Sequence, residues 1–318
     1  MNPARSNGKN DRRLRPQATS RQRQGDHGRA ARSARFRGDA TAHQTVRVTE
    51  RDEGRRRESF NEVAELYDRA RPGYPDELLI DLWELAGLSP SSRVLEIGCG
   101  TGQLTVPMAR TGVQIVAVEL GADLAAVARR NLAGFDHVQV VEAAFEDWPL
   151  PDESFDLVVS ATAFHWLDPQ VRLVKSARAL RRPGGAVAII STHHVAGGTA
   201  GFNERAQICY ERWADAEPGY RFPTVESIRS SDELDLSPRF GTVTTRRYVR
   251  DLPYTTQAYL ELLGTYSNNR ALTDHACAGL FACLSDLIDS RFGGHIVKTV
   301  MTELQLATVA ATTPEPTA

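Results

Sequence analysis

The sequence predicts an α/β fold in which a mostly parallel sheet carries helices on both faces. Short runs rich in Val and Ile alternate with segments of helical periodicity between residues 93 and 191, the pattern of a sheet buried between two helical layers. The first run, Val94–Ile97, leads into Gly98, Gly100 and Gly102 and then into a helix. Parallel sheets bind ligands beyond the carboxyl ends of their strands, so this turn is the first candidate binding site.

The elements follow from periodicity and from helix-stop and turn residues. Two helices should precede the sheet: one opens at Ser59–Glu62, which has the form of a capping box, and one covers 76–86 and ends at Gly87. We then expect strands at 93–97, 114–119, 138–141, 155–160 and 186–191, with helices at 103–110, 122–132 and 170–180. Beyond them we expect helices at 201–214, 225–234, 255–263 and 271–291 and strands at 240–250 and 295–308.

The two ends of the chain differ from the rest in composition. Residues 1–57 contain 16 Lys and Arg against 6 Asp and Glu and almost no large apolar side chain, so this segment is expected to be a disordered basic tail. Clustered Arg can attract nucleic acid or anionic lipid, but a solvated tail or upstream sequence from a misplaced start also fits. We divide the remainder into 58–195, the cap helices and first half of one domain, 196–313, its second half, and a frayed tail at 314–318.

Composition also predicts where the protein resides. No run reaches the roughly 18 apolar residues of a membrane span, and the tail lacks the apolar region of a secretory signal. Cys99, Cys209, Cys277 and Cys283 have no Cys-x-x-Cys spacing, so we expect reduced thiols in a cytoplasmic protein. No metal site is indicated.

The glycine turn narrows the cofactor. A dinucleotide fold favours Gly-x-Gly-x-x-Gly, whereas the third glycine here comes one residue sooner, which counts against NAD. Glu96-x-Gly98-x-Gly100-x-Gly102 resembles the signature of class I S-adenosylmethionine-dependent methyltransferases. The resemblance implies a Rossmann-like, seven-stranded sheet whose last strand is antiparallel, with helical inserts after residue 195 forming a lid over the methyl acceptor.

The same resemblance implies a set of cofactor-binding residues. In the family the glycine loop holds the methionine part of the cofactor, and the acid that ends strand two takes the ribose hydroxyls. Phe145 would flank the adenine; Ala144 stands where many members have an Asp, so that contact is expected from Glu146, Asp147 or the backbone. Carried onto this chain, the predicted cofactor-binding residues are Glu96, Gly98, Gly100, Gly102, Gln103, Glu119, Leu120, Phe145, Glu146, Ser160 and Ala161.

Residues on the acceptor side come from two segments. Ser160 to Trp166 is similar to the His-Trp segment of trans-aconitate and ubiquinone-type methyltransferases, so His165 is the candidate general base and Trp166 a substrate contact. His193 and His194 are weaker candidates. Tyr67, Arg71 and Tyr74 resemble the cap residues that face the acceptor in small-molecule enzymes, although packing explains them equally well. Tyr266 and Ser267 either line the pocket or pack within the lid.

These residues predict transfer of the sulfonium methyl group to a small organic acceptor, by O-, N- or C-methylation. Two alternatives remain open: a nucleic-acid methyltransferase using the Arg-rich tail, and a non-catalytic S-adenosylmethionine-binding protein. The first is disfavoured because Ser160–Ala163 occupies the place of an Asn/Asp-Pro-Pro-aromatic motif and because residues 58–318 carry 22 basic against 34 acidic side chains. Neither the acceptor nor the oligomeric state follows from the sequence.

Overall fold

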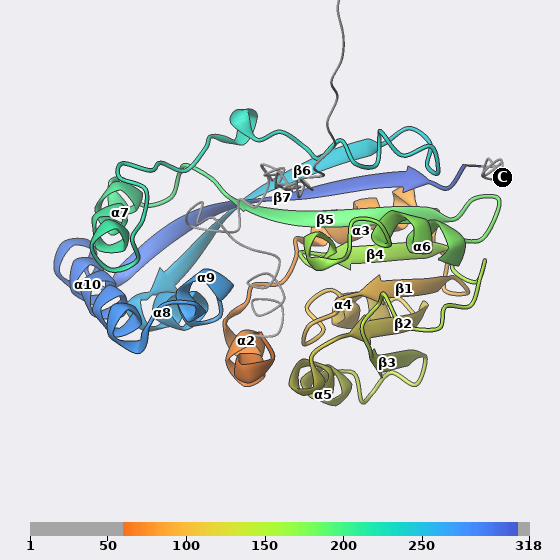
Figure 1. Ribbon diagram of the computed structural model, residues 1–318, viewed down its shortest axis with the longest axis horizontal. Coiled ribbons are helices and arrows are strands. Elements are labelled where there is room, and N and C mark those ends of the chain that lie inside the picture. Colours follow the sequence, from red (N-terminus) through yellow and green to blue (C-terminus); the bar gives the residue numbers. More distant parts are fainter. Residues whose placement is uncertain (1–59, 311–318) are drawn as a thin grey trace, which may run out of the picture. The chain divides into compact units, whose positions relative to one another are not determined.

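The computed structural model of the protein describes residues 60–310, which form a seven-stranded sheet with the strand order β3-β2-β1-β4-β5-β7-β6 (Figure 1). The predicted tails at 1–57 and 314–318 lie outside the described residues. Strands β1 to β5 are all parallel, and β7 is antiparallel to both of its neighbours. The predicted mostly parallel sheet with an antiparallel last strand is therefore confirmed.

The parallel half of the sheet has the strands that the sequence predicts, to within a few residues. Its strands are β1 Arg93–Ile97, β2 Gln114–Glu119, β3 Val138–Glu142, β4 Leu157–Ala161 and β5 Ala186–His194. Strand β1 lies between β2 and β4, and the chain leaves it at the carboxyl edge of the sheet. The glycine turn therefore lies at the centre of that edge, where neighbouring strand ends surround it.

Alternating side chains divide the core into two layers. Val94 faces one layer and Leu95 the other, because successive residues of a strand point to opposite faces. The first layer is covered by α3 (Asp76–Leu85), α4 (Thr105–Ala109) and part of α5 (Ala122–Asn131), and the second by α6 (Arg172–Ala179). Both faces of the sheet are thus buried, which explains the continuous apolar runs of the central strands.

The last two strands are long and carry a separate helical cluster. Strands β6 (Thr244–Thr255) and β7 (His295–Thr308) extend past the parallel strands and reach α7 (Phe202–Trp213), α8 (Thr256–Gly264) and α10 (Asp274–Phe292) (Figure 1). The short α9 (Ser267–Arg270) follows α8. We call α7 to α10 the lid helices. Their own core contains Phe202, Leu263, Leu284 and Ile288 and closes against Ile296 of β7.

The N-terminal cap begins differently from the prediction. A 3₁₀ turn, η1 (Asn61–Val63), precedes α2 (Ala64–Ala70), and no side chain caps α2. Asn61 instead caps α5: its Oδ1 accepts hydrogen bonds from the backbone N–H groups of Asp123 and Leu124, at 2.6 and 3.2 Å. The proposed capping residue Ser59 lies outside the described residues. Helix α2 packs between α5 and α8, so it joins the parallel half of the sheet to the lid helices.

One predicted helix is wrong. Residues 225–234 form only a 3₁₀ turn, η3 (Val225–Ser227), followed by irregular chain. The backbone carbonyls of Val225 and Ile228 accept hydrogen bonds from the guanidinium of Arg247 on β6, at 3.2 and 2.9 Å. Leu234 is buried in the second core layer. Contacts with the sheet therefore override the helical periodicity of this segment.

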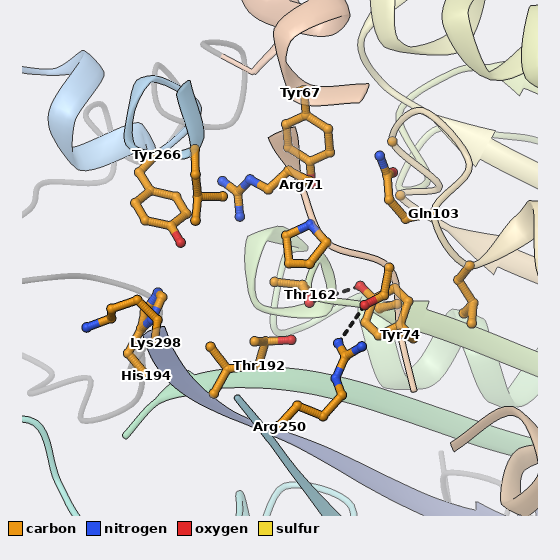
Figure 2. A pocket seen from close by; sticks show the side chains of 18 of the residues that line it. Tyr67, Arg71, Tyr74, Gln103, Thr162, Thr192, His194, Arg250, Tyr266 and Lys298 are labelled. Atoms are coloured by element: carbon orange, nitrogen blue, oxygen red, sulfur yellow. Dashed lines mark hydrogen bonds between the residues drawn. The ribbon is translucent and has the colours of Figure 1, made fainter. Parts of the chain in front are cut away.

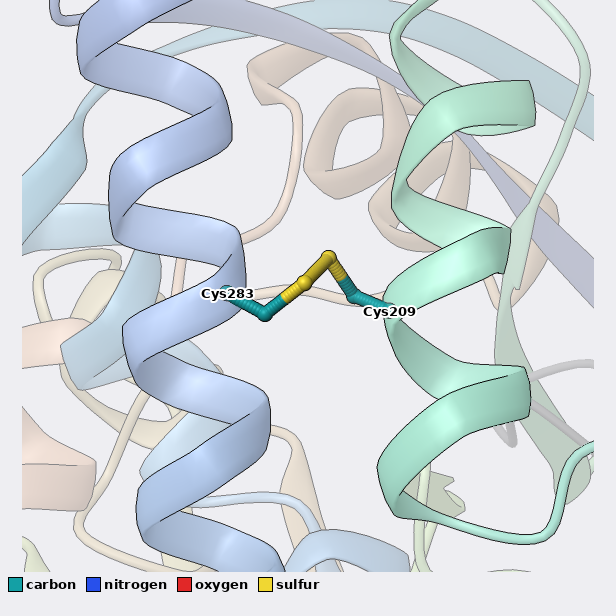
Figure 3. The surroundings of a disulfide bond; sticks show 2 residues. All are labelled: Cys209 and Cys283. Atoms are coloured by element: carbon teal, nitrogen blue, oxygen red, sulfur yellow. A yellow bond between two sulfur atoms is a disulfide. The ribbon is translucent and has the colours of Figure 1, made fainter.

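The prediction of reduced thiols is wrong for two cysteines. Cys209 on α7 and Cys283 on α10 form a disulfide, with their Cα atoms 5.8 Å apart (Figure 3). They are 74 residues apart in sequence, so only the packing of the two helices brings them together. Cys99 and Cys277 are free thiols. The disulfide lies within the lid helices.

Within residues 60–310, no helix has both the length and the apolar character needed to cross a membrane. The same residues contain no group of three or more His, Cys, Asp and Glu side chains arranged to hold a metal ion.

Candidate active site

The glycine turn between β1 and α4 has the backbone shape that the sequence suggested. Gly98, Gly100 and Gly102 have φ values of 72°, 58° and 101°, a region that side chains disfavour. Gly98 also lies against the end of β4, where an added Cβ would be 2.5 Å from the Cβ of Ala163. Any other residue at position 98 would therefore collide with Ala163 and shift the turn or the end of β4.

Glu119 fixes this turn to the end of β2. Its Oε2 accepts a hydrogen bond from the backbone N–H of Gly100 and its Oε1 accepts one from Gly121, both at 2.9 Å. The side chain is 7% exposed. Because each carboxylate oxygen can accept more than one hydrogen bond, Glu119 can hold the turn and still accept from a ligand.

Glu96 presents an unsatisfied polar atom. It is 1% exposed, and its Oε2 has no hydrogen-bond partner among residues 60–310. Burial, with a smaller contribution from nearby Glu119, raises the pKa of this carboxyl to about 7. An unpaired buried carboxylate is costly, so the position favours a ligand that brings a donor or a positive charge.

Two adjoining pockets meet at the glycine turn. We call them the outer pocket and the inner chamber, and both are lined by Tyr67, Arg71, Gly98, Gly100, Ala161, Thr162 and Tyr266. Residues of the outer pocket alone include Phe60, Ile97, Val118, Glu119, Leu120, Leu124, Ala143, Phe145, Ala163, His165, Trp166 and Leu167. Residues of the inner chamber alone include Tyr74, Glu96, Gln103, Thr192, His194, Arg250, Tyr254, Tyr259 and Lys298, several of which Figure 2 shows.

Most of the predicted cofactor-binding residues line one of these pockets. Gly98, Gly100, Glu119, Leu120, Phe145 and Ala161 line the outer pocket, and Glu96 and Gln103 line the inner chamber. Phe145 is buried in the core layer beneath the pocket. Their roles as ligand contacts stay predictions.

Three predicted cofactor residues lie outside both linings. Glu146 Oε1 accepts a hydrogen bond from the backbone N–H of Asp168 at 3.2 Å, and Ser160 Oγ donates to the Ile97 carbonyl at 2.9 Å. The Gly102 N–H donates to the Cys99 carbonyl at 2.9 Å. These contacts lie in the loops and strand ends around the pockets, and none of the three residues lines either pocket.

The structure separates the candidate histidines. His165 and Trp166 lie in the turn η2 (Phe164–Trp166) with ring centroids 4.8 Å apart, and both line the outer pocket and not the inner chamber. His194, at the end of β5, lines the inner chamber and is 7% exposed. Burial, then the charges of Lys298 and Arg71, lower the pKa of His194 to about 3. Its imidazole is therefore neutral at pH 7.

The three predicted substrate residues of the N-terminal cap all line the inner chamber. The guanidinium of Arg71 lies between two aromatic rings, 4.8 Å from the centroid of Tyr67 and 4.5 Å from that of Tyr266. The hydroxyl of Tyr74 is 3.1 Å from Thr162 Oγ1, and burial raises its pKa. Trp166, the fourth predicted substrate residue, lines only the outer pocket.

Sequence reasoning missed the contribution of the last two strands to the chamber. Arg250 and Tyr254 come from β6, Lys298 from β7 and Tyr259 from α8. The sequence did mark Lys298, because it is the only charged side chain between His295 and Met301. Lysine is rarely fully buried unless it is paired, so a lysine in an apolar strand indicates a functional position. No signal marked Arg250, because Arg246, Arg247 and Arg250 all lie on β6 and residue type alone does not tell which of them lines a pocket.

The site fits the cofactor that the glycine signature implies. The outer pocket has an apolar wall with one carboxylate at a strand end, which suits an adenosine group. The unpaired Oε2 of Glu96 suits an ammonium group, and Gly98 and Gly100 of the glycine turn line both pockets. In these features the chain's own residues match S-adenosylmethionine.

Comparisons with known proteins also indicate a methyltransferase domain. Residues 95–189 match the methyltransferase domain family. An uncharacterized methyltransferase of Mycobacterium tuberculosis is 36% identical over 132 residues, covering 42% of this chain and 51% of that protein. Demethylmenaquinone methyltransferase of Clavibacter sepedonicus is 34% identical over 140 residues, covering 41% of this chain and 55% of that one. The chain thus spans about half the length of these curated relatives.

A solved structure shares the fold over a longer region. A putative type II methyltransferase from Anaeromyxobacter dehalogenans matches with a TM-score of 0.53 at 22% identity, covering 75% of this chain and 97% of that one. The signature of the glycine turn, the sheet topology and the domain match lead to the same family. Residues 95–189 form a domain of the methyltransferase family, and the fold of the described residues is that of a solved methyltransferase.

Proposed function

We propose that this protein transfers the methyl group of S-adenosylmethionine to a small organic acceptor bound in the inner chamber. The observation that carries this proposal is the pair of adjoining pockets. One is built on the glycine turn and Glu119, and the other is enclosed by the cap, the lid helices and the last two strands. A cofactor in the outer pocket would present its reactive end toward the residues that both pockets share.

The chain's residues mainly hold and enclose the reactants. The bound cofactor supplies an activated sulfonium methyl group, so the protein needs little acid–base chemistry. Tyr67 covers the glycine turn: a Cβ on Gly100 would lie 3.5 Å from its ring. Together with Tyr266 it narrows the junction between the pockets. Holding two reactants in line is equivalent to effective molarities of about 10⁵ to 10⁸ M.

The positions of the histidines bear on the type of acceptor. His165 lines the outer pocket, so its role as general base requires an acceptor that reaches past the shared residues. His194 lies in the chamber, but its lowered pKa of about 3 makes it a weak base. A carboxylate acceptor needs no base. The chamber therefore suits an acceptor that is already nucleophilic when it binds.

The first experiment is calorimetric titration with S-adenosylhomocysteine. Glu119→Ala should weaken binding by about 1 to 3 kcal/mol, because ribose contacts and the support of Gly100 are lost together. Glu142→Ala is the matched control, since Glu142 is the register partner of Glu119 at the end of β3 and its side chain is about half exposed. Equal affinities in the two variants would remove the outer pocket as the cofactor site.

A second experiment separates an enzyme from a binding protein. Wild-type protein is incubated with S-adenosylmethionine and candidate acceptors, and release of S-adenosylhomocysteine is measured by chromatography. Acceptor-dependent product that Glu119→Ala reduces supports the proposal. Tight cofactor binding with no product from any small acceptor supports the binding protein, and product that forms only with RNA or DNA supports the nucleic-acid enzyme.

A further inference from the structure

The inner chamber contains more positive than negative side chains. Arg71 follows α2, Arg250 lies on β6 and Lys298 lies on β7, so three separate parts of the chain bring a cation to the same cavity (Figure 2). The chamber lining includes one carboxyl group, that of Glu96. Among residues 60–310, none of the three cations lies within ion-pair distance of a carboxylate.

Arg250 is only partly satisfied. One terminal nitrogen, Nη2, donates to the carbonyl of Gly73 at 2.6 Å, whereas the buried Nε has no hydrogen-bond partner in the described part of the chain. Asp76 and Glu77 influence it electrostatically, but both are exposed at the start of α3 and neither lines the chamber. Burial lowers the pKa of the Arg250 guanidinium, so its charge is incompletely compensated.

Lys298 is more deeply buried. Its side chain is among the buried polar groups at 3% exposure, and Nζ donates to Asn203 Oδ1 at 2.5 Å and lies 4.2 Å from the ring centroid of Phe222. Burial lowers its pKa to about 7, and the charge of Glu204 offsets only part of this. The ammonium group therefore lies in a site of neutral and aromatic groups.

Buried cations are costly unless an anion compensates them. Arg71 has two hydrogen bonds, both to uncharged atoms of Thr265, at 2.8 and 3.0 Å. The missing compensation for Arg250 and Lys298 can come from a bound ligand. Tyr254 and Tyr259 line the same cavity, and their rings offer an apolar surface to the rest of that ligand.

We propose that the methyl acceptor is an anion, a carboxylate or phosphate ester with an aromatic or apolar body, recognised by Arg250 and Lys298. This inference rests on the proposed function and names the acceptor class for the same site. Arg71 lines both pockets, so a ligand carboxylate bound by Arg71 can belong either to the acceptor or to the cofactor. Neither Arg250 nor Lys298 lines the outer pocket, so both distinguish the two sources. Lys298 also lines a third pocket, beside Asn203 and Phe222, whereas Arg250 lines the inner chamber and neither of the other two.

The test compares anions with neutral analogues. The complex with S-adenosylhomocysteine is titrated with benzoate, phenylacetate and phenyl phosphate, and separately with benzamide, phenylacetamide and phenol. We expect at least one anion to bind at least 10-fold more tightly than its neutral partner. If no anion of this set binds more tightly than its neutral partner, the inference is overturned.

Variants locate the binding groups. Arg250→Met and Lys298→Met should each lower the affinity for the anion about 10-fold. The affinity for S-adenosylhomocysteine should stay the same, which also shows that each variant is folded correctly. Arg250→Lys keeps the charge and should retain most of the anion affinity. The matched control is Arg246→Met, an exposed arginine on the same strand, which should behave like wild type.

The possible outcomes separate this inference from the proposed function. Undiminished anion binding in both methionine variants, with cofactor binding intact, overturns the assignment to Arg250 and Lys298. A loss confined to S-adenosylhomocysteine in Arg71→Met assigns that arginine to the cofactor and leaves the acceptor inference standing. Absence of S-adenosylhomocysteine binding in wild-type protein would instead overturn the proposed function itself.

Discussion

The outer pocket and the inner chamber are built in different ways. The outer pocket is built mainly on the ends of the parallel strands, and its one carboxylate, Glu119, is three residues from a helix that starts at Ala122. The inner chamber combines residues as far apart as Tyr67 and Lys298. The floor of the first is a product of the βα repeat, to which the cap and the lid add Phe60 and Tyr266. The second also needs β6 and β7, which supply Arg250 and Lys298. Cofactor binding and acceptor binding should therefore respond to different substitutions.

The largest expected effect concerns the lid. Cys283→Ser opens a disulfide that spans 74 residues, so the chain-entropy estimate gives a loss of about 4 kcal/mol in the free energy of unfolding. Urea denaturation without reductant measures it. Cys277→Ser, a free thiol on the same helix, should change stability by less than about 1 kcal/mol. Equal stability of the two variants would contradict a disulfide between Cys209 and Cys283. Where the variant is folded, anion affinity should fall more than S-adenosylhomocysteine affinity.

The second effect is the pH dependence of stability that Glu96, in the lining of the inner chamber, should produce. Burial raises the folded-state pKa of Glu96 from 4.5 to about 7, so the folded protein holds a proton that the unfolded chain releases. This stabilisation is complete below pH 4.5 and is lost as the pH rises through 7, a change of up to about 3 kcal/mol. Glu96→Gln should remove it, as measured by unfolding of the cofactor-free protein from pH 4.5 to 8. If the free energy of unfolding of Glu96→Gln depends on pH in the same way as that of wild type, Glu96 is not the source of this pH dependence. Glu142→Gln is the control and should behave like wild type.

The third effect concerns the glycine turn, which lines both pockets. Gly98→Ala places a Cβ 2.5 Å from Ala163 at a φ of 72°, and strain of this kind costs about 1 to 3 kcal/mol. We expect S-adenosylhomocysteine affinity to fall about 10- to 100-fold by calorimetry. Gly134→Ala is a suitable control, because nothing lies within 4 Å of a Cβ there. If both variants bind equally well, the ligand does not contact the turn.

The smallest effect asks which pocket Arg71 serves. Thr265→Val removes the hydroxyl that accepts from Arg71 Nε at 2.8 Å but leaves the carbonyl bond, a loss of about 1 kcal/mol in binding. Thr265→Ser keeps the hydroxyl and should therefore retain the wild-type affinity. Titrations with S-adenosylhomocysteine and with the preferred anion then show which affinity falls by about 5-fold. Wild-type affinities for both ligands in Thr265→Val would show that Arg71 needs no such support.

The sequence predicted the parallel half of the fold well because each element there carries its own local signal. Strand β1 at Arg93–Ile97 and β2 at Gln114–Glu119 have the predicted bounds, since apolar runs bounded by turn residues leave few alternatives. The helix expected at 225–234 failed because hydrogen bonds from Arg247 to its carbonyl groups come from a strand some 20 residues away. Local periodicity contains no information about such a partner.

By itself, the sequence determined the cofactor half of this protein. Glycines with positive φ, an acid before them and an acid ending the next strand occur within 24 residues, from Glu96 to Glu119, and their backbone requirements can be read from residue type. Only the tertiary structure decided the acceptor half. It placed His194 in the chamber and His165 outside it, joined Cys209 to Cys283, and brought Arg250 and Lys298 to one cavity. The reason is physical: these contacts join residues far apart in sequence, and their chemistry arises from burial that no single segment produces.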